Sequence, residues 1–238
     1  ANNVLAHIDD LHDVFKGIVT LLRPDGVFIF EAHWVGNLLG TGGFDQIYHE
    51  HLCYFSLHTI SQLADKFKLK VLSISLVPIH GESLRVTLGK VGTPEKSVKL
   101  FLERESKLGL TKHKAYARFA TKVEKNRETL VNLLKRLKKE GKKIVGYGAP
   151  AKGNTLLNYS GITQDIVSFI TDTTPSKQGL FAPGARIPIL APENLHASPS
   201  DYILLLSWNY AEEILRKEAV LRKAGVKFII PVPEVKIV

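Results

Sequence analysis

Four polar residues stand in a row in the stretch FDQIYHEHLCYF, which runs from Phe44 to Phe55. They are Tyr48, His49, Glu50 and His51, and each can accept, donate or hold a proton. An imidazole that titrates near neutral pH can act as a general base, while a neighbouring carboxylate or phenol fixes its tautomer. The pattern predicts proton-transfer chemistry here, although a polar surface loop would have the same composition.

A metal site in the same stretch has little support. His49 and His51 are two residues apart, so they would share a face on a strand and diverge on a helix. Cys53 is the only cysteine, and no Cys or His stands at finger-like spacing. We therefore expect no metal site in this chain. A single cysteine also excludes an internal disulfide and fits a reducing compartment.

The residues around this stretch predict strands and helices in alternation. Apolar residues at helical spacing predict a helix over 9–22, and the apolar run 26–31 predicts a buried strand after it. A second helix is expected over 56–67, with Ser56 as its cap. Two further strands, at 70–77 and 84–88, are expected to form a hairpin.

The second half of the chain shows a long helical pattern followed by a second α/β pattern. Helix formers dominate residues 97–140, with an interruption at Gly109 and an apolar stripe that predicts core packing. The alternation after this pattern predicts a small parallel sheet. Its expected elements are strands at 143–149, 166–171, 202–206 and 227–230, with one helix through Tyr159 and another over 210–223.

The 238-residue chain has a net charge of +9, and this charge is unevenly distributed. Residues 96–143 contain 16 Lys or Arg and 5 Glu, which leaves about −2 for the rest. A solvated helix face explains this excess better than nucleic-acid binding, and attraction of a phosphorylated substrate is a second interpretation. No apolar run approaches the roughly 20 residues of a membrane helix. We expect a cytoplasmic protein without nucleic-acid or membrane partners, and the start at Ala1 and the lack of Met indicate part of a longer polypeptide.

The glycine-rich turn GYGAPAKG, from Gly146 to Gly153, lies between an expected strand and an expected helix. Backbone N–H groups in such a turn can cradle a phosphate. Its spacing departs from both the G-x-G-x-x-G fingerprint and the Walker pattern. Asp172 follows about where a ribose-binding acid would stand. Nicotinamide binding therefore stays open, but binding of the diphosphate or sugar of an activated sugar, with Lys152 as a point charge, is favoured.

Further long motifs occur along nearly the whole chain: NVLAHI (3–8), LRPDGVFIFEAHW (22–34), YHEHLCYFS (48–56), IHGESLRV (79–86), GYGAPAKGNTLLNY (146–159), PGARIPI (183–189) and LLLSWNYAEEI (204–214). In this order they resemble the S-adenosylmethionine-dependent C-methyltransferases that act on nucleotide-linked keto-sugars. The resemblance implies S-adenosylmethionine as cofactor. It also implies that the family's glycine loop for this cofactor, and a cysteine-rich zinc module before it, lie upstream of Asn3 and are absent from this chain.

The resemblance implies roles for individual residues. His51 is the expected base within a catalytic cluster that comprises Asn3, His7, Tyr48, Glu50 and His51. Cofactor contact is expected from Asn3, Val4, Leu5, Ala6 and His7.

A second set of residues is expected to bind the substrate. Ser83 and Arg85 alternate with apolar residues, so one strand face could meet substrate phosphates. Trp208 and Asn209 follow an expected parallel strand, at the edge where open sheets bind ligands. The full expected set is Tyr147, Lys152, Asn154, His80, Ser83, Arg85, Trp208 and Asn209.

Together these observations predict an α/β protein in three parts. Residues 1–92 would form the C-terminal part of a class I methyltransferase sheet, 93–142 a helical connector, and 143–238 a Rossmann-like α/β domain. The expected reaction is C-methyl transfer to the carbon next to the ketone of a nucleotide-linked deoxysugar, through an enolate formed with the help of a base. A nicotinamide-dependent oxidoreductase and a non-catalytic sugar-nucleotide-binding module are the alternatives.

Overall fold

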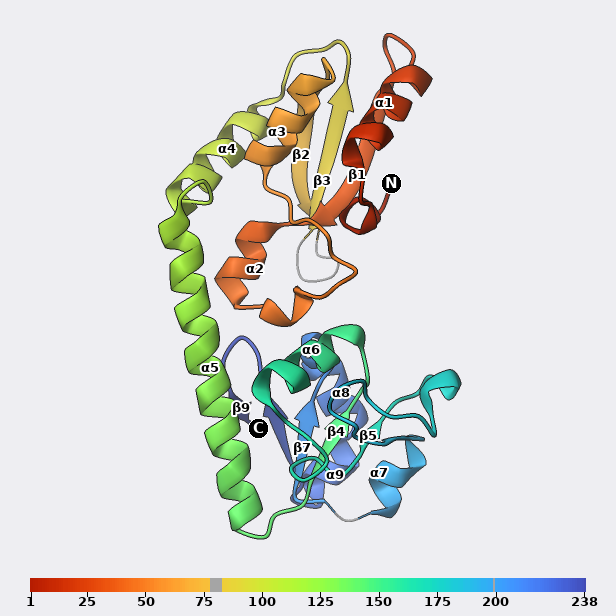
Figure 1. Ribbon diagram of the computed structural model, residues 1–238, viewed down its shortest axis with the longest axis vertical. Helices are drawn as coiled ribbons and strands as arrows, with labels where there is room; N and C mark the ends of the chain where they lie inside the picture. Colours follow the sequence, from red (N-terminus) through yellow and green to blue (C-terminus); the bar gives the residue numbers. More distant parts are fainter. Residues whose placement is uncertain (78–82, 199) are drawn as a thin grey trace. The chain divides into compact units, whose positions relative to one another are not determined.

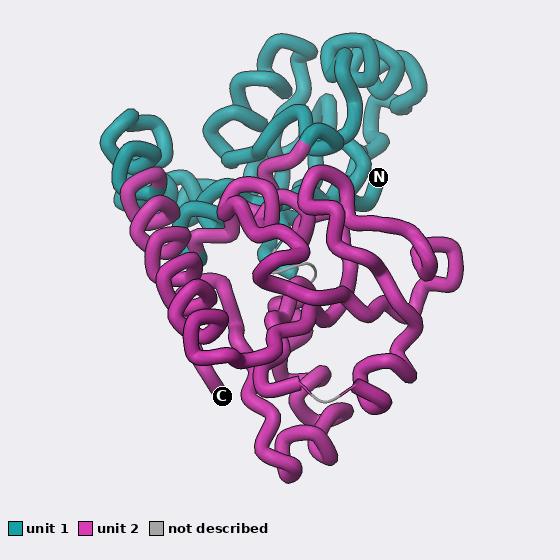
Figure 2. The backbone as a smooth tube through the Cα atoms, turned by 60° about the horizontal axis from the view of Figure 1, so that its bottom comes forward, with its two compact units in different colours: residues 1–41, 49–119 teal, residues 42–48, 120–238 magenta. Residues whose placement is uncertain are grey.

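The computed structural model describes residues 1–77, 83–198 and 200–238. These residues form two compact units, which Figure 2 shows in different colours. Unit 1 contains residues 1–41 and 49–119, and unit 2 contains residues 42–48 and 120–238. A short segment that interrupts unit 1 in the sequence therefore packs with the C-terminal half of the chain. We keep the three-part division of the sequence, at 92 and 142, as a proposal.

Unit 1 is built on a three-stranded antiparallel sheet of order β1-β3-β2 (Figure 1). The register pairs Phe30 of β1 with Val86 of β3, and Ala32 with Leu84. The predicted hairpin is confirmed, and the turn between its strands lies outside the described residues. The elements are η1 (Leu5–His7), α1 (Leu11–Leu21), β1 (Val27–His33), α2 (Val35–Thr41), α3 (Leu57–Lys66), β2 (Lys70–Val77), β3 (Ser83–Gly89) and α4 (Lys96–Leu108).

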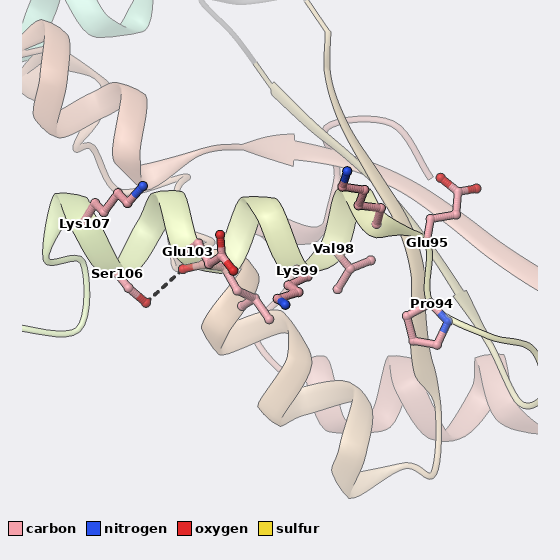
Figure 3. A pocket seen from close by; sticks show the side chains of 9 residues that line it. Pro94, Glu95, Val98, Lys99, Glu103, Ser106 and Lys107 are labelled. Carbon is pink, nitrogen blue, oxygen red and sulfur yellow. Dashed lines mark hydrogen bonds between the residues drawn. The ribbon is translucent and has the colours of Figure 1, made fainter.

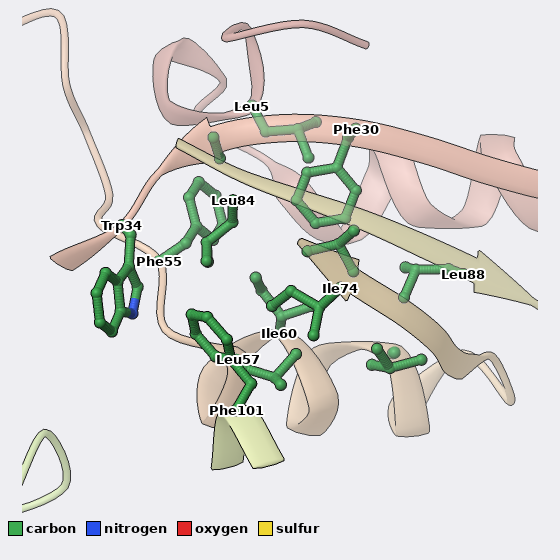
Figure 4. Close-up of a cluster of buried hydrophobic side chains, with 14 of the residues drawn as sticks. Leu5, Phe30, Trp34, Phe55, Leu57, Ile60, Ile74, Leu84, Leu88 and Phe101 are labelled. Atoms are coloured by element: carbon green, nitrogen blue, oxygen red, sulfur yellow. The ribbon is translucent and has the colours of Figure 1, made fainter. Parts of the chain in front are cut away.

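The core of unit 1 lies between this sheet and helices α3 and α4. Figure 4 shows Phe30 and Leu84 of the sheet facing Leu57 and Ile60 of α3, with Phe101 of α4 beside them. All of these side chains are buried. Burying apolar surface at roughly 25 cal/mol per Å² is the main force that fixes the sheet against the helices.

Helix α3 begins as its sequence predicts. The Ser56 hydroxyl accepts a hydrogen bond from the backbone N–H of Thr59, and the Thr59 hydroxyl accepts one from the backbone N–H of Ser56. This reciprocal capping box satisfies two amide groups that would otherwise lack partners at the start of the helix. Ser56 directly follows the polar stretch described above, so the cap fixes where that stretch ends.

The long helical pattern is interrupted where predicted. Gly109 ends α4 in the left-handed conformation, with φ of +72°, which favours glycine. Helix α5 (His113–Lys139) then runs from unit 1 into unit 2. Within its apolar stripe Val123, Leu130 and Leu137 are buried, whereas Tyr116 is 40% exposed. Core packing is thus confirmed for most of the stripe but not for its first residue.

Unit 2 is a six-stranded sheet of order β6-β5-β4-β7-β8-β9. All neighbouring pairs are parallel except β8 with β9. The predicted parallel sheet and the mixed α/β class are therefore confirmed. The elements are η2 (Phe44–Gln46), β4 (Ile144–Tyr147), α6 (Ala151–Ser160), β5 (Ile170–Thr171), η3 (Pro175–Lys177), β6 (Ile189–Leu190), α7 (Glu193–Ala197), β7 (Tyr202–Leu205), η4 (Trp208–Tyr210), α8 (Ala211–Lys217), α9 (Ala219–Lys223), β8 (Lys227–Ile230) and β9 (Lys236–Ile237).

Two predicted elements of unit 2 differ in the structure. The strand expected at 166–171 is regular only over Ile170–Thr171. The helix expected at 210–223 is divided into α8 and α9 at Glu218, whose side chain is buried. No Gly or Pro marks this break in the sequence. The Glu218 carboxylate accepts a hydrogen bond from the Tyr147 hydroxyl and lies 3.2 Å from Nε2 of His196. Helices α2 and α7 and strands β6 and β9 were not predicted.

Candidate functional site

Three imidazole rings gather in unit 1 at the carboxyl end of β1. The ring of His51 lies 5.0 Å from that of His7 and 5.1 Å from that of His33, measured between centroids. The ring of Tyr54 stands edge-on to His51 at 6.3 Å. His51 and His33 are partly buried and His7 is exposed, so the cluster is open to solvent on one side.

Backbone hydrogen bonds explain why these rings meet. The N–H of Leu52 donates to the carbonyl of Ala6 at 2.8 Å, which places His51 beside His7. The N–H of Val35 donates to the carbonyl of Phe55 at 2.9 Å, which joins the end of β1 to the segment after the polar stretch. Leu5 and Ala6 are buried, so the loop that carries His7 is anchored in the core.

His33 was not predicted as a site residue. It ends β1, whose buried residues Phe30, Glu31 and Ala32 direct the strand through the core. The signal that could have found it was present in the sequence: a histidine at the carboxyl end of an expected strand, within one of the long motifs. Only the fold shows that it lies next to His51.

A second polar group in unit 1 surrounds Glu31, which is 5% exposed. Arg85 of β3 lies opposite Glu31 and donates to its carboxylate from Nε at 2.8 Å and from Nη2 at 2.6 Å. The Ser83 hydroxyl lies 3.5 Å from Oδ1 of Asn3, and Asn3 has a positive φ of 52°. The ion pair gives Arg85 a structural role, so phosphate binding by Arg85 stays a prediction.

The remaining residues predicted for this site are spread out. Glu50 is exposed, and Tyr48 is partly buried and belongs to unit 2 rather than unit 1. The side chains of Leu5 and Ala6 are in the core, whereas Val4 is 42% exposed. His80 lies outside the described residues.

A second polar cluster lies in unit 2, at the carboxyl ends of β4 and β7. The sheet continues from β4 through β5 to β6 on one side and from β7 through β8 to β9 on the other. Open α/β sheets bind ligands at such a switch point in the strand order. Lys152 donates to Oδ1 of Asn209, and its ammonium group lies 4.7 Å from the centroid of the Trp208 ring. Three of the predicted substrate residues thus come together.

Asp45 completes this cluster and was not predicted as a site residue. Its side chain is fully buried, and Trp208 Nε1 donates to its Oδ2 at 2.5 Å. Burial raises the pKa of Asp45, although the bond from Trp208 and the charge of Lys152 act in the opposite direction. Burial also lowers the pKa of Lys152, and the charge of Asp45 opposes that shift. Burial thus disfavours the charged form of both groups.

Tyr147 and Asn154 do not join the Lys152 cluster. The hydroxyl of Tyr147 donates to Glu218 Oε1 at 3.1 Å. Burial and the nearby Glu218 carboxylate raise the pKa of Tyr147 far above its usual range. Asn154 lies two positions after Lys152 on α6, and residues at that spacing face different directions on a helix. Substrate binding by either residue stays a prediction.

The glycine-rich turn is explained by protein packing. A Cβ at Gly146 would lie 2.8 Å from Ile170, one at Gly148 would overlap the Ser207 hydroxyl, and one at Gly153 would lie 3.0 Å from Leu206. The glycines therefore let β4 and α6 approach their neighbours closely.

Hydrogen bonds within the protein also occupy this turn. Gly148 N–H donates to the carbonyl of Thr171, and Ala149 N–H donates to Asp172. Burial alone would raise the pKa of Asp172, but hydrogen bonds from Thr174 and Ala149 and the charge of Lys177 together lower it. Because Asp172 serves the turn itself, the geometry does not favour a ribose-binding role.

A pocket lies along α4 and shares no lining residue with either cluster. Figure 3 shows its lining, which includes Val98, Lys99 and Ser106 and none of the predicted site residues. Among the residues that the structure describes, no group of three or more His, Cys, Asp or Glu is arranged to hold a metal ion. Within the same ranges, no helix combines the length and apolar character needed to cross a membrane.

Comparison with known families matches the chain in two parts. Residues 78–233 match the family of C-methyltransferase C-terminal domains, and residues 1–74 match a methyltransferase domain. The chain belongs to the C-methyltransferase family. It is 37% identical to the C-methyltransferase NovU of Streptomyces niveus over 236 residues, which cover 98% of this chain and 56% of that relative. This C-methyltransferase-family chain therefore spans little more than half the length of its relative.

Proposed function

We propose that this chain carries the base and part of the ligand-binding surface of an enzyme that transfers a methyl group from S-adenosylmethionine to a nucleotide-linked deoxysugar. The acceptor would be the carbon next to the sugar's ketone. The observation that carries this proposal is the group of three imidazoles around His51 in a chain of the C-methyltransferase family.

Residues 3–7 fit cofactor binding in part. Asn3 and Val4 precede η1 and His7 ends it, next to the carboxyl end of β1, and Val4 and His7 are exposed to a ligand. Leu5 and Ala6 are buried in the core, so only their backbone could contribute. We therefore assign cofactor contact to the side chains of Asn3, Val4 and His7. When bound, S-adenosylmethionine supplies an electrophilic methyl group.

The chemistry assigned to this chain is the removal of a proton. His51 takes the proton from the carbon next to the ketone, and the electron pair of the broken C–H bond is delocalised onto the carbonyl oxygen. That negative charge needs a hydrogen-bond donor, and Tyr48, which the family resemblance assigns to the catalytic cluster, is our candidate. The carbon would then form the new bond to the methyl group as the bond between that methyl and the sulfonium sulfur breaks, and the neutral thioether would leave with the electron pair of the broken bond. The proton on His51 leaves through the exposed imidazole of His7, 5.0 Å away between ring centroids, to solvent.

We assign binding of the nucleotide-sugar to Lys152 and Asn209 of unit 2. Both lie at the switch point of the parallel sheet, and a lysine ammonium is a suitable partner for a diphosphate or a sugar hydroxyl. The neighbouring Trp208 ring offers an apolar face. The glycine turn does not favour the nicotinamide alternative, because its close contacts and N–H groups are used within the protein.

The decisive experiment uses the natural protein in its full length. It is incubated with S-adenosylmethionine and a panel of nucleotide-linked keto-sugars, and methylated sugar is detected by mass spectrometry. We expect one acceptor class to gain a methyl group and the His51→Asn variant to lose at least 100-fold in rate, at the low end of the roughly 10²–10⁴-fold contribution of a general base. His113→Asn, at an exposed histidine of α5, is the matched control.

The same protein distinguishes the two other hypotheses. Binding of nucleotide-sugar without binding of S-adenosylmethionine would favour a non-catalytic module. Hydride transfer with a nicotinamide cofactor would favour an oxidoreductase. Activity that survives His51→Asn unchanged would remove the base from its proposed role even if methyl transfer itself were observed.

A further inference from the structure

Of the three imidazoles in the cluster of unit 1, that of His33 stands on a strand. His33 is the last residue of β1, and the register pairs it with Ser83 of β3, which is fully buried. The next residue, Trp34, lies in the core, and its Nε1 donates to the buried carboxylate of Glu105 at 2.8 Å (Figure 4). The backbone that carries the His33 ring is therefore fixed both across the sheet and along the chain.

His51, the proposed base, lies in a segment without regular structure. Residues 51–54 form neither helix nor strand. The segment is tied to η1 by the bond from Leu52 N–H to the carbonyl of Ala6 at 2.8 Å. This bond fixes the path of the chain, but the side-chain torsions of His51 have several staggered positions open to them. The direction of the His51 ring therefore depends on the groups that surround it.

Three rings contact the ring of His51. The His33 ring is tilted by 46° to it at 5.1 Å between centroids, and the rings of His7 and Tyr54 stand at 62° and 86° at 5.0 and 6.3 Å. All three lie in the range of about 4.5–7 Å in which aromatic rings attract one another. His7 is exposed, and Tyr54 belongs to the same irregular segment as His51. His33 is thus the ring contact that joins His51 to the sheet.

We propose that His33 is a positioning residue: its ring packs against the ring of His51 and holds the proposed base in the orientation that removes the proton. This inference rests on the proposed function, in which His51 is the base. A base must point a ring nitrogen at the proton that it takes, whereas His33 needs no contact with substrate for its role. Both residues belong to unit 1.

The test compares His33→Ala, His33→Phe and His33→Asn in the natural full-length protein, with the keto-sugar that the parent protein methylates. Alanine removes the ring, phenylalanine keeps a ring without its polar atoms, and asparagine keeps a polar group without the ring. Two rates are measured for each variant: methyl transfer, and exchange of the substrate's acidic hydrogen for deuterium from solvent. Active sites are counted by binding of S-adenosylmethionine.

His12 of α1 provides a matched control in the same unit. Its ring stands edge-on to the ring of Phe67 at 5.5 Å between centroids, and the residue is exposed. His12→Ala therefore also removes a histidine ring that packs on another ring, but outside the imidazole cluster. It should leave both rates per active site unchanged. A loss as large as that of His33→Ala would show a general effect of lost packing and would overturn the proposal.

A ring pair of this geometry contributes free energy that corresponds to a factor of about 2 to 13 in a rate. We expect His33→Ala and His33→Asn to lower both rates at saturating sugar by about 3- to 10-fold per active site, with KM for the sugar unchanged. His33→Phe keeps the ring contact and should retain both rates within about twofold. A purely structural role would lower the number of active sites and leave these rates per site unchanged.

A double variant tests whether His33 acts through His51. His33→Ala combined with His51→Asn should be no slower than His51→Asn alone, because the ring that His33 holds is already gone. Three outcomes would each overturn the proposal: full rates in His33→Ala, rates retained in His33→Asn but lost in His33→Phe, or a multiplicative loss in the double variant.

Nuclear magnetic relaxation of the His51 ring tests the inference without any activity. Protein with isotope-labelled histidine gives a signal for each ring, and the signal of His51 is identified by its loss in His51→Asn. The order parameter of this ring should fall in His33→Ala and stay at the parent value in His33→Phe. An unchanged order parameter in His33→Ala would overturn the proposal. If the parent protein methylates no sugar, the proposed function fails, and the order parameter still decides whether His33 holds the His51 ring.

Discussion

Replacing Glu105 should destabilise the part of unit 1 that supports the imidazole cluster. Glu105 lies on α4 and is fully buried. Its Oε1 accepts from Trp34 Nε1 at 2.8 Å and from Leu57 N–H at 2.7 Å. Its Oε2 accepts from His58 N–H at 3.0 Å and lies 2.7 Å from His58 Nδ1. One carboxylate thus joins the residue after His33 to the start of α3.

The magnitude follows from this arrangement. A hydrogen bond to an ionised group contributes about 1.5–3 kcal/mol, but bonds to one group are not additive. Removing one member of a buried charged network typically costs about 3–5 kcal/mol. We expect Glu105→Ala to lower the free energy of unfolding of unit 1 by about this amount, which is a large share of the roughly 5–15 kcal/mol that holds a domain together.

Urea unfolding combined with amide hydrogen exchange measures the effect. Exchange should rise most at the first turn of α3, where Leu57 and His58 lose their acceptor. Glu103→Ala is the matched control, because it makes the same substitution two residues away at an exposed site of α4 and should change stability by less than about 0.5 kcal/mol. A loss below about 1 kcal/mol for Glu105→Ala, or unchanged exchange at Leu57, would refute the reasoning.

Three further predictions concern local features. Ser56→Ala removes the capping box of α3 and should lower the free energy of unfolding, measured by thermal unfolding, by about 1 kcal/mol. Unchanged stability would show that water replaces the cap and would contradict this prediction. Gly148→Ala should lower the free energy of unfolding by about 2–4 kcal/mol, since φ is +81° and the added Cβ would overlap Ser207. Gly141→Ala is the control: φ there is +74°, but the added Cβ would meet no atom within 4 Å, so the loss should be only about 1 kcal/mol. Equal losses in the two variants would contradict the packing explanation. The pKa of Asp172 is lowered on folding, so the stabilisation by its carboxylate is present above the ordinary value of 3.8 and is lost as pH falls through the lower folded value. The difference in melting temperature between the parent protein and Asp172→Asn should therefore be constant down to about pH 5 and shrink below about pH 4. A difference that is the same at all pH values would contradict this prediction.

The sequence predicted the elements whose signals are local. Ser56 and Thr59 stand side by side in the chain and cap α3, and Gly109 ends α4 in the conformation that glycine favours. The length of β5 and the break between α8 and α9 were not predictable in the same way. The break lies at Glu218, whose carboxylate meets Tyr147 from β4, and no neighbouring residue in the chain signals that contact.

The candidate site shows the same division between local and distant information. Motif resemblance predicted His7 and His51 as site residues, and alternation along a strand predicted Ser83 and Arg85. The role of Arg85 depended on Glu31, which lies opposite it only because β1 and β3 pair in one register. His33 and Asp45 were not predicted, because the residues that they contact, His51 and Trp208, lie far away in the sequence.

The sequence by itself determined the family, the mixed α/β class and the identity of the imidazole at the centre of the proposed reaction, because these depend on residue types in a fixed order. Only the tertiary structure decided that His33 joins His51, that Arg85 is paired with Glu31, and that the segment before His49 packs in the other unit. The physical reason is that strand register and buried polar bonds join residues tens to more than a hundred positions apart, and the energy of those contacts is settled by packing rather than by local sequence.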